Sequence, residues 1–192
     1  GRVIAVTDPA TGDWIGQIPA LTAAESLEAI TAAERAFPAW VALLPQQRSA
    51  LLRRWHDGVV AHREDLAVLM TLEQGKPISE ARGEIDYAAS FIEFYAEEAK
   101  RTNIESVTPH LAGAGMSVRR QPMGVAALVT PWNFPSAMIT RKAAAALAAG
   151  CTTVVHPSRY TPFSALALAE LAERAGLPAG TFNIVTGEGE TG

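Results

Sequence analysis

A single side-chain amide, Asn133, follows the apolar run 125–129 in a loop bounded by two prolines. An apolar run that leads through a polar loop into an alanine-rich segment is how α/β enzymes present groups at the carboxyl edge of a sheet. There the NH₂ group of Asn133 can donate to an oxyanion on a bound substrate, which lowers the barrier by about 2.7–4 kcal/mol in comparable sites. Asparagine before a helix is also a common N-cap. The pattern alone leaves both roles open.

A second candidate is the tetrapeptide His156-Pro157-Ser158-Arg159, which ends the next apolar run. Doubly wound proteins that bind NAD place Asp or Glu at this point, whereas those that bind NADP use Arg near the 2′-phosphate. The tetrapeptide has no acid, and a guanidinium with a hydroxyl suits a phosphate better than two neutral hydroxyls. Arg159 therefore favours NADP, with a solvated surface charge as the alternative.

Other chemistry-bearing residues give weaker signals. Residues Gly187–Gly192 match G-x-G-x-x-G, but they follow the third apolar run and no helix is visible after them, which favours a turn over a pyrophosphate site. Cys151 follows a helix-stop glycine and enters an apolar strand, so we expect a small core residue and not a nucleophile. His56, His62 and His110 have no ligand spacing and no motif, so we expect surface or structural roles and no metal site.

The elements that would position these residues alternate between strands and helices. The pattern predicts β-α-β-α-β, with strands over 125–130, 153–156 and 182–186 and helices over 135–149 and 162–175. Apolar strands separated by helices indicate parallel pairing with right-handed crossovers. The predicted class is α/β, an N-terminal helical layer plus the first half of a doubly wound parallel sheet over 125–192.

The helical layer lies upstream. Residues 3–18 resemble a hairpin around a turn cluster, and Thr22 with Glu25 has capping-box spacing. Helices are expected over about 22–37, over about 46–74 with a break or continuation near 62, and over 79–100. The last helix carries an apolar stripe that needs a partner surface, and we expect the sheet to be that partner.

A polar connection over 103–115 and an extended edge segment over 116–124 separate the two parts, and Pro122 is tolerable in such an edge. We therefore divide the chain into a hairpin and helical part over 1–110, an extended segment over 111–124 and the half-sheet over 125–192. Gly1 and Gly192 resemble cut or processed ends.

The composition excludes several classes of partner. The chain has 16 Lys and Arg against 20 Asp and Glu, a net charge of −4, and no basic block that could follow a phosphate backbone, so we expect no nucleic acid. The longest nearly apolar stretch, 143–155, is interrupted by Gly150 and two threonines and is too short to cross a bilayer. With one cysteine and no visible signal peptide, we expect no disulfide framework, no membrane and a cytoplasmic location.

Several long segments occur in order: MTLEQGKP at 70–77, YAASFIEF at 87–94, GVAALVTPWNFPSAMITRK at 124–142, ALAAGC at 146–151, TPFSALALAELA at 161–172 and GLPAGTFN at 176–183. Together they resemble the aldehyde dehydrogenase superfamily, and within it the succinate-semialdehyde dehydrogenases. The resemblance covers essentially the whole chain. It implies an aldehyde dehydrogenase-like fold and NAD(P)-dependent oxidation of an aldehyde, here succinate semialdehyde, through a cysteine thiohemiacetal, hydride transfer and thioester hydrolysis.

The resemblance also implies roles for individual residues. Asn133 matches the oxyanion-hole asparagine, and Arg141 matches an arginine that holds the distal carboxylate of the substrate, where a bidentate pair prefers Arg to Lys. Residues 115–125 resemble the entry to an oligomerisation arm, which implies a homo-oligomer, a dimer or tetramer. The cofactor contacts implied by position are Thr130, Pro131, Trp132, His156, Pro157, Ser158, Arg159 and Gly189.

Two departures from the family matter. A lysine that binds the cofactor ribose is replaced by His156, which keeps a hydrogen bond and loses the charge, so we expect weaker cofactor binding. The nucleophilic cysteine and the general-base glutamate of the family lie downstream of the third strand, so we expect these 192 residues alone to be inactive. The competing interpretations are a truncated, non-catalytic paralogue that serves as a binding or assembly module, and a relative that reduces acyl phosphates.

Overall fold

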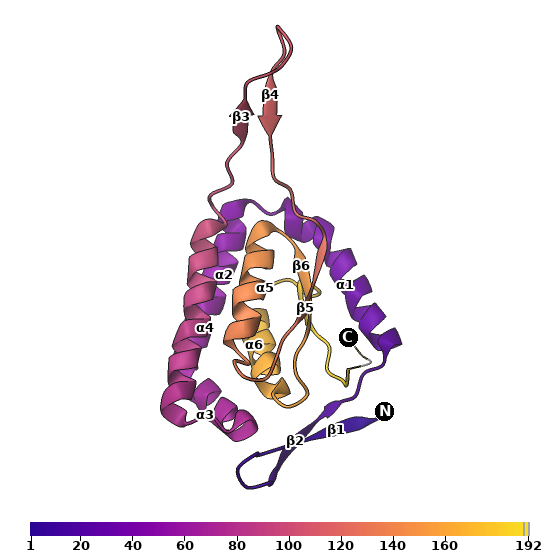
Figure 1. Cartoon of the computed structure of the whole chain (residues 1–192), viewed down its shortest axis with the longest axis vertical. Coiled ribbons are helices and arrows are strands. Elements are labelled where there is room, and N and C mark those ends of the chain that lie inside the picture. The colour runs from indigo at the N-terminus through magenta and orange to yellow at the C-terminus, as the bar shows by residue number, and fades with distance from the viewer. Residues whose placement is uncertain (190, 192) are drawn as a thin grey trace.

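A three-stranded parallel sheet forms the centre of the protein. The computed structural model describes residues 1–189 and 191. The strand order in the sheet is β5 (Val125–Val129), β6 (Thr152–His156), β7 (Phe182–Ile184). Both strand pairs are parallel. The connections are the helices α5 (Ala137–Ala149) and α6 (Pro162–Arg174) (Figure 1). The predicted β-α-β-α-β order and the α/β class are confirmed.

The two faces of the sheet are covered by different helices. On β6, Val154 clusters with Ala33 of α1 (Ala23–Ala42), whereas Val155 joins the larger core with α5 and α6. Because neighbouring residues of a strand point to opposite faces, α1 covers one face and α5 and α6 cover the other. An outer layer then covers α5 and α6 and consists of α2 (Pro45–Ala61), α3 (Arg63–Gln74) and α4 (Ile78–Glu98) (Figure 1).

The apolar stripe of α4 faces helices. Its buried residues Ile85 and Ile92 belong to the same core cluster as Ile139 and Leu147 of α5, and α4 also packs on α2 and α3. The expectation that the sheet is the partner of this stripe is wrong, because α5 already covers that face of the sheet. No helix in the described part of the chain is both long enough and apolar enough to span a membrane.

The N-terminal hairpin is confirmed as β1 (Val3–Thr7) and β2 (Trp14–Pro19), and α1 begins at the predicted capping box. The Glu25 N–H donates to Thr22 Oγ1 (3.3 Å), and the Thr22 N–H donates to Glu25 Oε2 (2.7 Å). The helix continues past its predicted end at 37 to Ala42, although Pro38 lies inside it. Trp40 holds this last turn, because its ring is buried and its indole N–H donates to Leu147 O (3.2 Å).

Charged side chains of the outer helices close the N-termini of both connecting helices. Glu84 of α4 accepts two N–H groups at the start of α5, and Glu73 of α3 accepts two at the start of α6. The donors are Ser136 (3.0 Å), Ala137 (3.3 Å), Phe163 (2.7 Å) and Ser164 (2.7 Å). Negative charge at a helix N-terminus also complements the helix dipole. Two buried carboxylates therefore fix where α5 and α6 begin, at the edge of the sheet where the site is expected.

Guanidinium groups of α2 close the opposite ends. Arg48 Nε donates to Ala148 O (3.2 Å) at the end of α5, and Arg54 Nε donates to Ala175 O (2.7 Å) at the end of α6. A second Arg48 nitrogen donates to Leu43 O (2.6 Å). Each connecting helix thus has a carboxylate at its start and a guanidinium at its end, which is the arrangement that its dipole favours.

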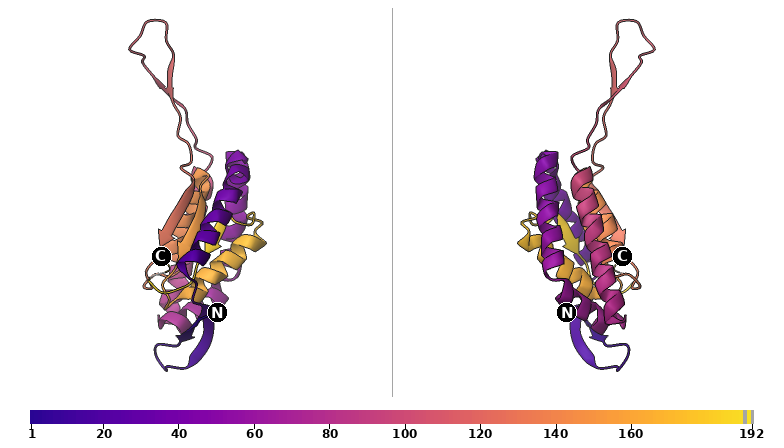
Figure 2. Two further views of the ribbon diagram at one scale, coloured as in Figure 1. Left: turned by 90° about the vertical axis from the view of Figure 1, so that its right-hand side faces the viewer. Right: turned by 90° about the vertical axis from the view of Figure 1, so that its left-hand side faces the viewer.

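A second hairpin stands away from the body of the protein in all three views (Figures 1 and 2). It pairs β3 (Glu105–Val107) with β4 (Met116–Val118), and every residue of both strands is exposed. The expected polar connection over 103–115 therefore contains a strand, which also precedes the arm predicted over 111–124. A three-residue strand with no buried face has no alternating pattern by which a sequence could reveal it.

Glu73 makes the stability of the fold depend on pH. Burial raises the pKa of Glu73 to about 7 from 4.5, against hydrogen bonds from Ser164 and Phe163 that lower it. Between these two pKa values the folded protein binds more protons than the unfolded chain, so the free energy of unfolding falls as the pH rises. The contribution of Glu73 to stability is therefore complete below the unfolded pKa and is lost as the pH rises through the folded pKa. We expect the unfolding free energy to fall by roughly 2–3 kcal/mol, relative to Glu73→Gln, between about pH 5 and about pH 8. Urea unfolding of both proteins checks this, and a difference that does not change with pH would contradict it.

Candidate functional site

A small cavity lies where the three parallel strands end, and we call it the strand-end cavity. Its volume is about 330 Å³, and it is lined by Val129, Thr130, Pro131, His156, Pro157, Ser158, Arg159, Gly187, Glu188 and Gly189. These residues end or follow β5, β6 and β7, whose carboxyl ends meet at one edge because the pairing is parallel. In an open α/β sheet this edge is where ligands bind. All the predicted cofactor contacts except Trp132 are brought together here.

One hydroxyl in this cavity lacks a partner. Thr130 is 4% exposed, and its Oγ1 has no hydrogen bond within residues 1–189 and 191. Its backbone N–H is satisfied by His156 O (3.1 Å). A buried hydroxyl without a partner costs about 1–3 kcal/mol, and a polar ligand in the cavity would supply one. The polar groups of the cavity, a hydroxyl, an imidazole and a guanidinium, fit the ribose hydroxyls and the phosphates of a nicotinamide dinucleotide.

His156 is held in one tautomer. Its Nδ1 lies 3.0 Å from Val185 O, and because a carbonyl oxygen only accepts, Nδ1 carries the proton. The neutral ring then offers Nε2 as a hydrogen-bond acceptor. A lysine at this position would offer only donors, so the substitution changes the hydrogen-bonding character of the site as well as its charge.

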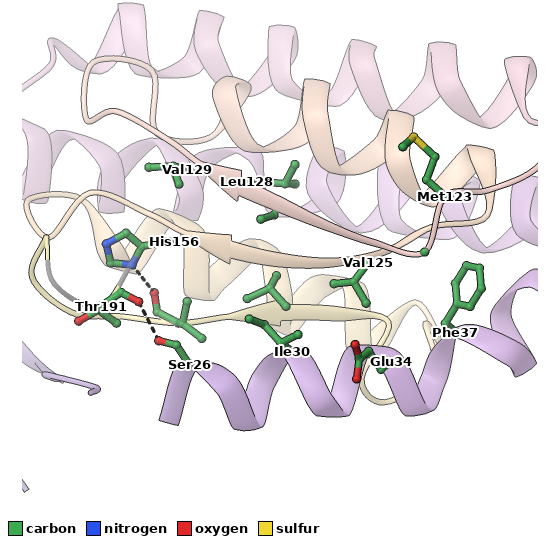
Figure 3. A pocket seen from close by; sticks show the side chains of 14 residues that line it. Ser26, Ile30, Glu34, Phe37, Met123, Val125, Leu128, Val129, His156 and Thr191 are labelled. Carbon is green, nitrogen blue, oxygen red and sulfur yellow. Dashed lines mark hydrogen bonds between the residues drawn. The ribbon is translucent and has the colours of Figure 1, made fainter. Parts of the chain in front are cut away.

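His156 also borders a second cavity, the α1 cavity, which lies between α1 and the sheet. This cavity has a volume of about 640 Å³ and an apolar lining that includes Ile30, Val125 and Leu128. Figure 3 shows His156 at one end of it and Phe37 with Met123 at the other. Sequence reasoning missed this cavity, because its walls come from segments that are far apart in the chain.

Arg159 meets an acid that was not expected. One guanidinium nitrogen lies 3.3 Å from Glu188 Oε1, and another donates to the Tyr160 hydroxyl (3.0 Å). The tetrapeptide at the end of β6 has no acid of its own, but the loop after β7 brings Glu188 to the same cavity. Arg159 is therefore paired as well as solvated. A phosphate that binds Arg159 has to compete with this carboxylate.

Trp132 lies apart from the other predicted contacts. Its side chain is half exposed and lines a third cavity of about 660 Å³, which is bounded by β1. Arg159 borders both this cavity and the strand-end cavity. Trp132 therefore lines a different cavity from the other predicted contacts, and Arg159 is the predicted contact that lines both.

Asn133 is exposed in the loop after β5, and its side chain is not the N-cap of α5. The N–H groups of Ser136 and Ala137 donate to Glu84 instead, so the capping alternative is wrong. The Asn133 backbone carbonyl accepts from Lys76 Nζ (3.0 Å). Its side-chain amide has no hydrogen bond among the described residues, so it is available to a ligand.

Arg141 lies on the second turn of α5 and is exposed. Across residues 1–189 and 191 no acidic side chain forms an ion pair with it. Neither Asn133 nor Arg141 lines the three cavities described above. The structure places both on the loop and helix that follow β5, next to the strand-end cavity in the chain but outside it.

The remaining candidates have structural surroundings. Cys151 is half-buried just before β6, so it is less enclosed than expected. His56 and His62 contact Asp57 and Asp65 (2.9 and 3.2 Å). His110 is exposed. The described residues contain no group of three or more side chains placed to hold a metal ion.

The glycine string forms a turn where it is described. Thr191 N–H donates to Glu188 O (2.9 Å), and a Cβ on Gly187 would lie 2.0 Å from Thr191 Oγ1, which only glycine avoids. Positions 190 and 192 of the string lie outside the described residues. The predicted turn agrees with this geometry.

Sequence reasoning missed the buried residues Glu73 and Glu84 and the Lys76 side chain, which is 9% exposed. A signal was present, because Glu84 lies three residues after Ala81 and four before Ala88, on the buried face of α4. An acid on the core stripe of an amphipathic helix needs a partner, since charged groups are seldom buried alone.

The model of the aldehyde dehydrogenase family matches residues 1–192. The NADP(+) succinate-semialdehyde dehydrogenase GabD of Escherichia coli (strain K12) is 59% identical over 187 residues, which are 97% of this chain and 39% of that protein. A glutarate-semialdehyde dehydrogenase of Pseudomonas aeruginosa is 57% identical over 193 residues, 100% of this chain and 40% of that protein.

A solved structure described as an E. coli NADP dependent enzyme superposes with a TM-score of 0.98 at 57% identity and covers 100% of this chain and 40% of that one. The chain thus spans about two fifths of the length of the relatives it matches. With the whole sequence matched by the family model and the fold shared, the chain belongs to the aldehyde dehydrogenase family.

Proposed function

We propose that the full-length protein oxidises an aldehyde with a distal carboxylate to the corresponding acid, with NADP or NAD as the oxidant. The observation that carries this proposal is the strand-end cavity, which gathers all the implied cofactor contacts except Trp132 from the ends of three separate strands. The loop with Asn133 leaves the same sheet edge. Within the full-length protein, these 192 residues would supply part of the nucleotide site and the oxyanion donor.

The residues of the strand-end cavity would hold the nucleotide, which supplies the hydride acceptor. Thr130 offers its unpaired hydroxyl, and His156 offers Nε2 as an acceptor. Arg159 is the one cation that lines the cavity within the described part of the chain. A guanidinium pairs strongly with phosphate, so we favour NADP over NAD. The relative from E. coli is named for NADP(+), which agrees with this preference.

Asn133 would act on the substrate carbonyl. Its amide is exposed and without a hydrogen bond in the part of the chain that the structure describes. A preorganised N–H donor stabilises the charge that develops on the carbonyl oxygen when a nucleophile attacks it. The attacking thiolate would come from the part of the protein beyond these residues, as the family resemblance implies.

Arg141 would select the substrate. Succinate and glutarate semialdehydes, the compounds in the names of the two relatives, both carry a carboxylate at the end opposite the aldehyde. Both Asn133 and Arg141 are exposed, and in this proposal Asn133 meets the aldehyde end of the substrate and Arg141 meets the carboxylate end. The projecting β3–β4 hairpin would serve as the contact between subunits of a homo-oligomer.

The substrate assignment is tested with Arg141→Ala in the full-length protein. Losing a charge-assisted pair with the distal carboxylate should reduce kcat/KM for succinate semialdehyde by about 10–100-fold. The uncharged aldehyde butanal serves as the control substrate, and its kcat/KM should change less than about threefold. Steady-state kinetics with both substrates check this, and similar losses for both would remove Arg141 from the substrate site.

The cofactor preference is tested with Arg159→Glu and the matched control Arg159→Gln. The first places a carboxylate beside Glu188, and the second only removes the charge. We expect the NADP-over-NAD ratio of kcat/KM to fall about tenfold in the Gln variant and further in the Glu variant. An unchanged ratio in both would show that Arg159 does not contact the 2′-phosphate.

The effect of the imidazole is tested with His156→Lys. An ammonium group should restore a charge-assisted hydrogen bond to the ribose and tighten nucleotide binding about fivefold. His156→Gln keeps an uncharged hydrogen-bonding group and should bind within about twofold of the natural protein. Calorimetric titration gives the three dissociation constants, and equal values for histidine and lysine would refute the idea.

A further inference from the structure

The buried pair Lys76 and Glu84 contacts the loop that carries Asn133 and has no role in the function described so far. Lys76 Nζ donates to the carbonyl oxygen of Asn133 (3.0 Å) and to the carboxylate of Glu84. The same ammonium lies 4.1 Å from the centre of the Phe134 ring. The Lys76 ammonium thus contacts three groups, the Glu84 carboxylate, the Asn133 carbonyl and the Phe134 ring, and two of these belong to the loop.

Glu84 connects this cation to α5. One oxygen of its carboxylate accepts the N–H groups of Ser136 and Ala137, and the other accepts from Lys76. The side chains of Lys76 and Glu84 are only 9% and 1% exposed. The loop from 133 to 137 is thus held at both ends by one buried ion pair, which comes from the segment between α3 and α4 and from α4.

The backbone before Lys76 is shaped for this contact. Gly75 ends α3 with a φ of 79°, a left-handed conformation that favours glycine, and a Cβ there would lie 2.9 Å from Pro9 Cγ. The chain turns at Gly75, and Lys76 then points into the protein. Gly75, the neighbour of Lys76 in the sequence, therefore helps to place Lys76 for its contact with Asn133.

We propose that Lys76 and Glu84 are positioning residues that hold the Asn133 amide in the direction needed to stabilise the oxyanion; this rests on the proposed function. A fixed carbonyl fixes the peptide plane of Asn133 and so limits where its Cα–Cβ bond points. Oxyanion donors act within 2.7–3.1 Å, and small displacements lower the rate steeply. The exposed Asn133 side chain has no contact of its own to supply this order.

The charge of the pair decides which variants are informative. Lys76→Met alone leaves the Glu84 carboxylate buried without its cation, which can destabilise the fold. The double variant Lys76→Met with Glu84→Gln removes both charges and keeps an amide oxygen for the N–H groups of Ser136 and Ala137. It therefore tests the contact to Asn133 even if the single variant unfolds.

A matched control exists at the other end of the same helix. Arg48 is also a buried cation that donates to backbone carbonyls, Ala148 O at the end of α5 and Leu43 O after α1, but it has no hydrogen bond to the Asn133 loop. In the full-length protein, the neutral double variant should lower kcat about 10–100-fold and leave the nucleotide dissociation constant within about twofold. Arg48→Met should lower the unfolding midpoint while kcat stays within about twofold.

The decisive measurement is a double-mutant cycle with Asn133→Ala. If the pair acts through the Asn133 amide, the neutral double variant should change kcat less than about threefold once that amide is absent. A purely structural role predicts the same fold loss in both backgrounds, and that result would overturn the inference. Equal loss in Arg48→Met and in the pair variant would overturn it as well.

The cycle also separates this inference from the proposed function. If Asn133→Ala leaves kcat unchanged, Asn133 is not the oxyanion donor and the proposed function fails in that part. If Asn133→Ala lowers kcat while the pair variant keeps full activity, the function stands and the positioning role is wrong.

Discussion

Buried residues lie at each of the four ends of α5 and α6, and a buried helix end has backbone N–H or C=O groups that need partners. Glu84 and Glu73 satisfy the N-terminal groups, and Arg48 and Arg54 satisfy carbonyls at the C-terminal ends. All four side chains come from α2, α3 and α4. The outer helical layer therefore both covers the two connecting helices and supplies the partners that their polar ends need once water is excluded.

The two carboxylates that satisfy the N-terminal N–H groups, Glu84 and Glu73, have different surroundings. Glu84 has Lys76 beside it, whereas Glu73 has only N–H donors, and burial raises the pKa of Glu73 to about 7. The cation near Glu84 contacts the loop after β5, where the proposed chemistry takes place. At α6 no ammonium or guanidinium group contacts Glu73 among the described residues.

The sheet and its order could be predicted from the sequence, because apolar runs, helix-stop glycines and prolines are local signals. The same holds for His156 to Arg159, which follow from the end of a strand. Glu188 and the partner of the α4 stripe could not be predicted, since both depend on which distant segments meet. The N-cap role of Asn133 was a reasonable local expectation, but Glu84, 49 residues earlier in the chain, takes that role.

The same hydrogen bonds bear on how a nucleotide could bind. At the start of α5 the N–H groups of the N-cap Ser136 and of the first three helical residues, up to Ile139, donate to Glu84, Phe134 O or Ser136 O. In α6 Thr161 N–H donates to Ser158 O, Pro162 has no N–H, and the next two donate to Glu73. The helix N-termini that usually bind phosphate in doubly wound folds are thus already satisfied from within. Phosphate binding would then depend on side chains such as Arg159, which agrees with the absence of a glycine-rich loop after β5.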